Sequence, residues 1–140
     1  MSPNLRRLFD IAQKPERTIV GLMSGTSLDG LDIALCSFSG SGWATRLSLL
    51  QFKTAPYNEA FRAEVRSVFA KQTIDFQQLV LLNTTVARRH AALLLDALKD
   101  WGIRPEAVDL VASHGQTVFH APASQHGLAA QPSATLQIGD

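Results

Sequence analysis

The spacing of hydrophobic and polar positions changes several times along the chain, and each change predicts a different element. Residues 1–17 read as a polar lead-in with one short helix over Leu5–Ile11, which ends before Pro15. The run Thr18–Met23 is apolar and partly β-branched, as in a buried strand. Two more strands are predicted at Leu31–Phe38 and Trp43–Phe52, with turns at Ser24–Gly30 and Gly40–Gly42. Together they form a three-strand meander.

A helical period follows Pro56. Apolar residues then recur on one face of a first helix, at Tyr57, Phe61, Val65, Val68 and Phe69. A longer helix is predicted to begin at Asp75, which resembles a capping box with Gln78. Its apolar stripe runs through Leu79, Leu82, Val86, Leu93, Ala97 and Trp101, until Gly102 and Pro105 end it.

The last part of the chain predicts a strand at Val108–Ala112 and two short strands at Val118–His120 and Thr135–Ile138, around a loop rich in Pro, Gly and Ser. Strands followed by helices and then strands predict an α/β fold, with a mixed sheet flanked by helices. We expect one domain over residues 18–140. Because no terminal helix or cap follows Gln137, we expect this domain to be truncated.

Composition narrows the classes of function. The 140 residues are 46% hydrophobic and 18% charged, with a net charge of +1. This balance indicates a globular domain and argues against binding to duplex nucleic acid, which usually needs a strong basic excess. Cys36 is the single cysteine and lies in an apolar run, so we expect a packed thiol. No run is long and apolar enough for a signal peptide or membrane span, and we expect a cytoplasmic protein.

The segment Gly21–Asp32, GLMSGTSLDGLD, lies between two predicted strands and carries the clearest chemistry. A glycine-rich hairpin can turn several backbone N–H groups toward one point, which suits phosphate oxygens. Thr26 and Ser27 add hydroxyl donors, and Asp29 and Asp32 are candidates to orient Mg²⁺ through water. By composition alone, an ordinary structural hairpin is the favoured interpretation of this segment. It has no Walker lysine and is followed by a strand, so it is not a P-loop.

Three blocks carry a family resemblance: the hairpin, SHGQTVFH over Ser113–His120, and LQIGD over Leu136–Asp140. The hairpin resembles the first phosphate-binding hairpin of the actin, Hsp70 and sugar kinase superfamily, which implies an RNase H-like half-domain. The three blocks together resemble the anhydro-N-acetylmuramic acid kinases. The resemblance implies ATP binding by the segment Gly25, Thr26, Ser27, Leu28, Asp29, Gly30, Leu31 and Asp32.

That family uses ATP and Mg²⁺ to convert 1,6-anhydro-N-acetylmuramic acid to N-acetylmuramic acid 6-phosphate in peptidoglycan recycling. Many members of the wider superfamily carry an aspartate two residues before the first hairpin glycine, where this chain has Met23, as the family pattern does. The metal is therefore expected to depend on Asp29, Asp32 or groups beyond this chain. The general base that activates water is expected downstream of Asp140, so the piece alone should be inactive.

The other two blocks supply candidate sugar ligands: His114, Gln116, Thr117 and Asp140. A structural role for His114 remains open, because histidines in turns often only bond to neighbouring backbone. His120 and His126 lack the companions of a zinc site. We expect His90 and Arg89 on the long helix to be surface or interface groups without a chemical role.

Two other readings remain: a non-catalytic nucleotide- or sugar-binding module that keeps only the hairpin, and an actin- or Hsp70-like ATPase. The second and third blocks argue against the ATPase. The expected partners are the sugar and ATP, and the resemblance is compatible with a homodimer.

Overall fold

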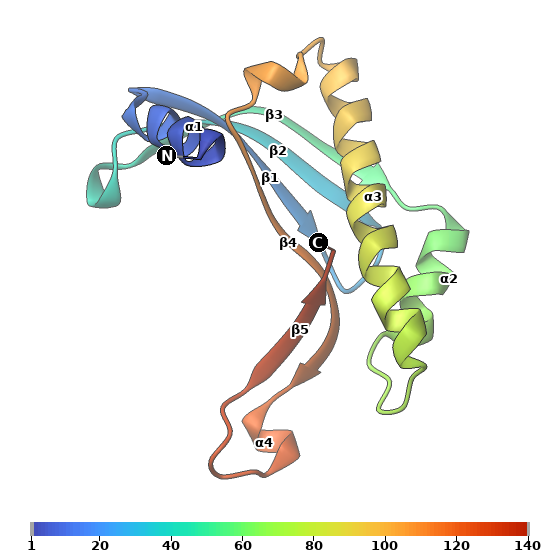
Figure 1. Ribbon diagram of the computed structural model, residues 1–140. Coiled ribbons are helices and arrows are strands. Elements are labelled where there is room, and N and C mark those ends of the chain that lie inside the picture. The colour runs from blue at the N-terminus through green and yellow to red at the C-terminus, as the bar shows by residue number, and fades with distance from the viewer. Residues whose placement is uncertain (1, 140) are drawn as a thin grey trace.

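The computed structural model describes residues 2–139, and one mixed sheet of five strands organises them, in the order β3-β2-β1-β4-β5 (Figure 1). The strands are β1 (Glu16–Ser24), β2 (Gly30–Ser39), β3 (Arg46–Pro56), β4 (Leu110–Ala121) and β5 (Ala134–Ile138). Neighbours are antiparallel except β1 and β4, which are parallel. The predicted meander and mixed α/β sheet are confirmed, and the finer RNase H-like assignment stays a prediction.

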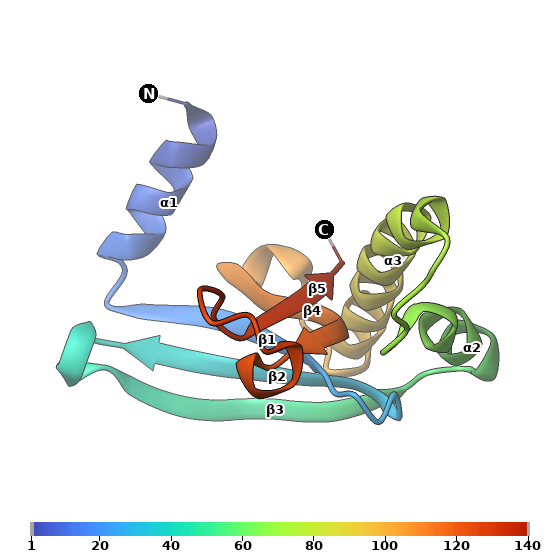
Figure 2. The ribbon, with the colours of Figure 1, turned by 90° about the horizontal axis from the view of Figure 1, so that it is seen from below.

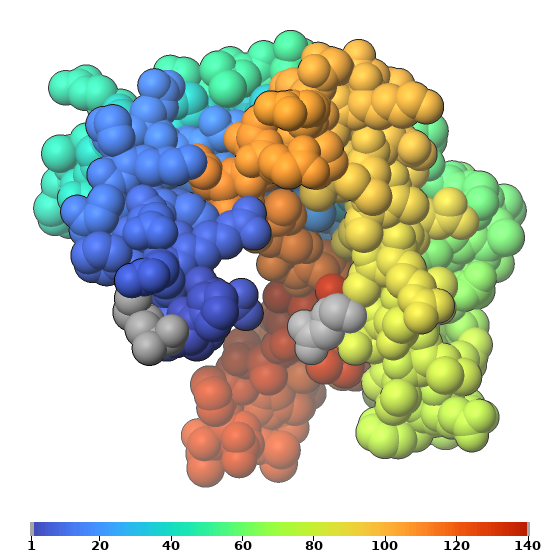
Figure 3. All heavy atoms as spheres, turned by 45° about the horizontal axis from the view of Figure 1, so that its top comes forward, coloured from blue at the N-terminus to red at the C-terminus, as the bar shows by residue number. Residues whose placement is uncertain are grey.

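Helices cover the two faces of this sheet unequally. The helices α2 (Glu59–Val68) and α3 (Phe76–Asp100) lie over one face, where Val20 and Leu22 of β1 enter the main core. Successive side chains of a strand point to opposite faces. Ile19 accordingly points the other way and lines a cavity of about 390 Å³ with Leu8 of α1 (Pro3–Gln13). Figures 2 and 3 show α1 standing apart from α2 and α3.

The predicted helical faces form the core largely as expected. Phe61, Val65 and Val68 of α2 are each at most 2% exposed. On α3 the predicted residues Leu82, Val86 and Ala97 are buried, and so are His90, Leu94 and Leu98, which were not in the predicted stripe. The Asp75 carboxylate caps α3 by accepting a hydrogen bond from the Gln78 backbone N–H (3.1 Å). The Gln78 side chain donates instead to the Ser67 hydroxyl (2.8 Å), so only half of the capping box forms.

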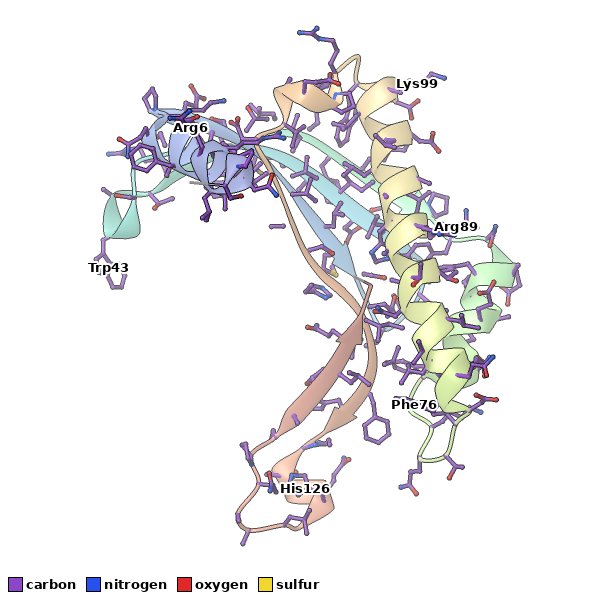
Figure 4. The ribbon with its side chains drawn as sticks, in the orientation of Figure 1. Arg6, Trp43, Phe76, Arg89, Lys99 and His126 are labelled. Carbon is purple, nitrogen blue, oxygen red and sulfur yellow. The ribbon has the colours of Figure 1, made fainter. Side chains whose placement is uncertain are left out.

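Element boundaries differ from the prediction in two places near the N-terminus. The strand β1 begins at Glu16, inside the predicted lead-in, because it pairs with β2 as far as Ser39. Trp43 was placed in a strand and instead lies in a 3₁₀ turn, Gly42–Ala44, with its ring fully in solvent (Figure 4). Gly42 has a φ of 53°, a left-handed conformation that interrupts an extended strand.

The segment Ser113–Thr117 lies between the predicted strands Val108–Ala112 and Val118–His120, and the predicted break there was wrong. The segment continues β4 through a bulge at Gly115, whose φ is 70°. The β1 partners shift there from Leu22 opposite Ser113 to Ser24 opposite Gln116. Sequence patterns miss such a bulge because the pairing that absorbs the extra residue is not local.

Among residues 2–139, no helix is both long and apolar enough to cross a membrane.

We predict that Gly115→Ala destabilises the domain far more than Gly127→Ala. Both glycines have left-handed φ values, 70° and 66°. Holding alanine in this conformation costs about 1–2 kcal/mol at either position. Only at Gly115 does an added Cβ meet backbone, 2.2 Å from the Ile138 carbonyl oxygen. We expect Gly115→Ala to cost roughly 3 kcal/mol or more in the free energy of unfolding, measured by urea titration. Equal losses for the two variants would contradict this packing.

Candidate functional site

The hairpin between β1 and β2 is a tight turn whose tip has free donors. The Gly25 carbonyl accepts from the Leu28 N–H (3.3 Å), which closes the turn over Thr26 and Ser27. Within the described part of the chain, the N–H groups of Thr26 and Ser27 donate to no protein acceptor, and both side chains are exposed. Adjacent unpaired amides of this kind form a concave, electropositive surface that suits an anion.

Leu28 anchors the turn from below. Its φ is 58°, a left-handed conformation that costs a branched residue about 1–2 kcal/mol. Its side chain is only 2% exposed and packs in the main core, which contributes a stabilisation of similar size, about 2 kcal/mol. The backbones of Leu28 and the fully buried Leu31 are therefore part of the hairpin segment, and their side chains pack in the core and fix the segment to the domain.

The two glycines of the hairpin serve different purposes. A Cβ on Gly30 would lie 2.5 Å from the Ala55 carbonyl oxygen, so Gly30 is required by the pairing of β2 with β3. A Cβ on Gly25 would meet nothing closer than the Ser27 hydroxyl at 3.6 Å, an ordinary contact. No contact within the protein thus requires glycine at position 25, and the open space that a Cβ would occupy there is available to a ligand.

The sheet brings the three sequence blocks together. The Ser24 hydroxyl donates to the Gln116 side-chain oxygen (2.5 Å), which joins β1 to β4. Gly115 packs against the Ile138 carbonyl of β5. The third block then contacts α3, because the Gly139 N–H donates to the Asn83 side chain (2.6 Å). Blocks far apart in the sequence therefore meet at the hairpin end of β1.

A chain of buried polar groups leads from this meeting point into the domain. The Ser24 hydroxyl also bonds to the Tyr57 hydroxyl (2.7 Å), which bonds to His90 Nε2 (2.9 Å). His90 is 4% exposed, so the prediction of a surface histidine was wrong. Its spacing of four residues from Val86 and from Leu94 indicates the buried face and could have revealed it.

Burial sets the protonation of this chain of groups. Desolvation by burial, and to a lesser degree the electrostatic interaction with His114, lower the pKa of His90 to about 4. Burial also raises the pKa of the Tyr57 hydroxyl, outweighing its bond to Ser24, while Asp32 raises it slightly further. Both groups are therefore neutral near pH 7.

Arg89 is less buried than the adjacent His90. Its guanidinium group lies over the Phe61 ring, 5.6 Å from the ring centroid, and it is partly exposed between α3 and α2 (Figure 4).

The candidate sugar ligands occupy different environments. Gln116 is fully buried, with its amide N–H groups 3.1 Å from the Thr117 carbonyl and 3.5 Å from the Gly25 carbonyl. His114 is exposed, and its Nδ1 lies 3.1 Å from the Gln137 side-chain nitrogen. Asp140 lies outside the described residues. A shallow cavity of about 240 Å³ is lined by Ser113, His114, Gly115, Gln137, Ile138 and Gly139.

A second cavity, of about 290 Å³, joins the hairpin tip to β4: Thr26 lines it together with Thr117 and His120. The candidate metal residues Asp29 and Asp32 do not line this cavity and lie in different settings. The Asp29 side chain is exposed, whereas the Asp32 carboxylate accepts from the Thr54 hydroxyl (2.6 Å) on the neighbouring strand. Residues 2–139 contain no group of three or more potential ligands able to hold a metal ion by themselves.

Comparison with known proteins places this chain among the kinases. A family model described as anhydro-N-acetylmuramic acid kinase matches residues 17–140. The chain therefore belongs to the anhydro-N-acetylmuramic acid kinase family. Kinases of that name from Pseudoalteromonas atlantica and Pseudoalteromonas translucida are 45% and 42% identical over all 140 residues, and each is matched over 35% of its own length. The kinase from Caldanaerobacter subterraneus is 37% identical over 96% of this chain and 34% of its own.

The chain thus spans about a third of the length of these curated relatives. A solved structure of CasPhi-2 bound to crRNA covers 91% of this chain with 15% identity and a TM-score of 0.29, which is too slight a likeness to bear on the fold.

The buried histidine predicts a dependence of stability on pH. Above pH 6.5 His90 is neutral in both the folded and the unfolded chain. Below that value His90 binds a proton in the unfolded chain but stays neutral in the folded chain down to about pH 4. The free energy of unfolding therefore falls as the pH is lowered through this range. The loss due to His90 is at most about 3 kcal/mol. Between pH 7 and 4, the free energy of unfolding measured by urea titration should decline less steeply in His90→Gln than in the parent. An equal decline in both proteins would contradict the low pKa of His90 in the folded chain.

Proposed function

We propose that this chain supplies the ATP-phosphate hairpin of an enzyme that opens 1,6-anhydro-N-acetylmuramic acid with water and phosphorylates the freed O6. The product is N-acetylmuramic acid 6-phosphate, and the reaction belongs to peptidoglycan recycling and amino-sugar catabolism. The observation that carries the proposal is the hairpin tip, with its unpaired Thr26 and Ser27 amides, in a chain that matches this kinase family over residues 17–140.

In this proposal the hairpin binds and aligns the nucleotide phosphates. The Thr26 and Ser27 amides and hydroxyls donate to phosphate oxygens, and the open side of Gly25 lets the backbone approach them. Phosphoryl transfer depends mainly on such positioning and on stabilising the charge in transfer, because little covalent chemistry falls to the protein. The cavity shared by Thr26, Thr117 and His120 offers the adjoining space for the acceptor sugar.

Mg²⁺ would neutralise charge on the transferred phosphoryl group when bound. Residues 2–139 hold no cluster of three potential ligands, so Asp29, Asp32 or groups beyond this chain would hold the ion together with nucleotide oxygens and water. The exposed Asp29 carboxylate is the better placed of the two candidates to orient a metal-bound water. Asp32 is already bonded to Thr54, so its role is secondary.

We assign His114 and Thr117 to the sugar side and Gln116 to a position behind the hairpin, because only Gln116 is fully buried. No residue of this chain is assigned as the general base that deprotonates water. As the chain covers about a third of its relatives, we place that base in the part of them that it does not match. The enzyme resides in the cytoplasm in this proposal.

The first test is ATP-dependent phosphorylation of 1,6-anhydro-N-acetylmuramic acid, with the product identified by mass. We expect the product of the complete reading frame to form the 6-phosphate and the 140-residue chain alone not to do so. Asp29→Ala should lower the rate by about tenfold through weaker metal orientation. If the complete product binds ATP yet does not phosphorylate this sugar, a nucleotide-binding module becomes the better description.

A matched pair of glycine variants tests the hairpin itself. Gly25→Ala should fold with a free energy of unfolding within about 1 kcal/mol of the parent, since its Cβ has room, but should bind ATP about tenfold more weakly. Gly30→Ala should instead lose about 3 kcal/mol of stability, because its Cβ would strike the Ala55 carbonyl. Calorimetric titration with ATP and urea unfolding separate the two effects. Unchanged ATP affinity in Gly25→Ala would argue against backbone approach at this glycine.

A further inference from the structure

Four polar side chains are buried in one line behind the hairpin. Ser24, Tyr57, His90 and Gln116 are 2%, 6%, 4% and 0% exposed. They come from four separate parts of the chain: β1, the residues before α2, α3 and β4. Burying a polar group is costly unless every donor and acceptor is paired, and apolar residues of similar volume are often at least as stabilising. This cluster therefore calls for a reason beyond stability.

The hydrogen bonds in this line all run in one direction. Both N–H groups of the Gln116 amide face carbonyls, so its oxygen faces Ser24 and can only accept. The single Ser24 hydroxyl proton is then used, and Ser24 must accept from the Tyr57 hydroxyl. Tyr57 has no second proton, so it must accept from His90 Nε2–H. The order is His90 to Tyr57 to Ser24 to Gln116.

Tyr57 also contacts the other end of the hairpin. Its backbone N–H donates to the Asp29 carbonyl (3.2 Å), whereas its hydroxyl bonds to Ser24, the residue before Gly25. One residue thus holds both ends of the turn that carries the Thr26 and Ser27 amides. The Tyr57 ring itself is fixed by an edge-on contact with Phe61, with 4.7 Å between the ring centroids.

We propose that Tyr57 is a positioning residue that clamps both ends of the hairpin. Ser24 and Gln116 connect the Tyr57 hydroxyl to Gly25 through hydrogen bonds, and His90 orients that hydroxyl. The clamp rests on the proposed function, because the aligned amides are those assigned to nucleotide phosphate. None of the four side chains is assigned to the nucleotide. Asp32 acts electrostatically on Tyr57, and His114 acts on His90, and neither is a member of the line.

Tyr57→Phe tests the clamp, because it keeps the ring and the backbone N–H and removes only the hydroxyl. In the product of the complete reading frame, with Mg²⁺ and a non-hydrolysable ATP analogue, we expect the Kd to rise about tenfold in calorimetry. The matched control is Ser37→Ala, which removes a buried serine hydroxyl bonded to Glu16 at the far end of β2. It should bind the analogue as the parent does. His90→Gln, which keeps an N–H donor, should bind within about threefold of the parent, whereas His90→Leu should resemble Tyr57→Phe.

Two further readouts need no nucleotide. Hydrogen exchange at the Leu28 and Tyr57 amides, which donate to the Gly25 and Asp29 carbonyls of the turn, should quicken in Tyr57→Phe and stay unchanged in Ser37→Ala. Nitrogen chemical shifts of His90 should report the Nε2–H tautomer at pH 7.

The outcomes separate the clamp from the kinase proposal. If the parent binds the analogue and Tyr57→Phe binds equally well, the clamp is overturned and the nucleotide site stands. If the parent does not bind, the nucleotide site fails, and the exchange rates then decide whether Tyr57 orders the hairpin. Unchanged exchange, or an Nδ1–H tautomer of His90, overturns the clamp in either case.

Discussion

The parallel pairing of β1 with β4 is the contact on which the rest of this structure depends. Parallel neighbours require a long crossover, and here the crossover contains the rest of the meander, α2 and α3. The pairing sets Ser24 opposite Gln116, residues 92 positions apart in the chain. The antiparallel return of β5 then adds Ile138 opposite Gln116. Three segments that carry the family resemblance thereby share one end of one sheet.

Glycines are abundant in these segments, and the structure shows that close packing requires glycine at some of these positions and not at others. At Gly30, Gly115 and Gly139 a Cβ would lie 2.9 Å or less from atoms of a neighbouring element, so the close approach of strands and of α3 excludes any side chain. At Gly25 no such contact exists. Glycine-rich motifs are often taken whole as ligand-binding sequences, whereas three glycines of these segments serve packing, which holds the exposed turn in place.

The buried polar line shows how an exposed turn is tied to a distant helix. A hairpin tip with unpaired amides is poorly ordered unless something fixes it, since its own donors have no partners in the protein. The core contact of Leu28 holds it from below, and the Tyr57 bonds hold its two ends. Through His90 this hold extends to α3, so the packing of that helix bears on the geometry of the site. Neutrality of His90 suits this role, because a buried charge there would need compensation.

The sequence by itself determined most of the elements, their order and the turn between β1 and β2. Those features are local: alternation of apolar residues, caps such as Asp75, and turn residues from Ser24 to Gly30 each act over a few positions. Tertiary structure alone decided that Gln116 faces inward, because the bulge at Gly115 shifts the alternation of β4 and arises from pairing with strands far away in the chain. It also decided that His90 meets Tyr57, since a hydrogen bond between α3 and the residues before α2 exists only once the helices have packed on the sheet.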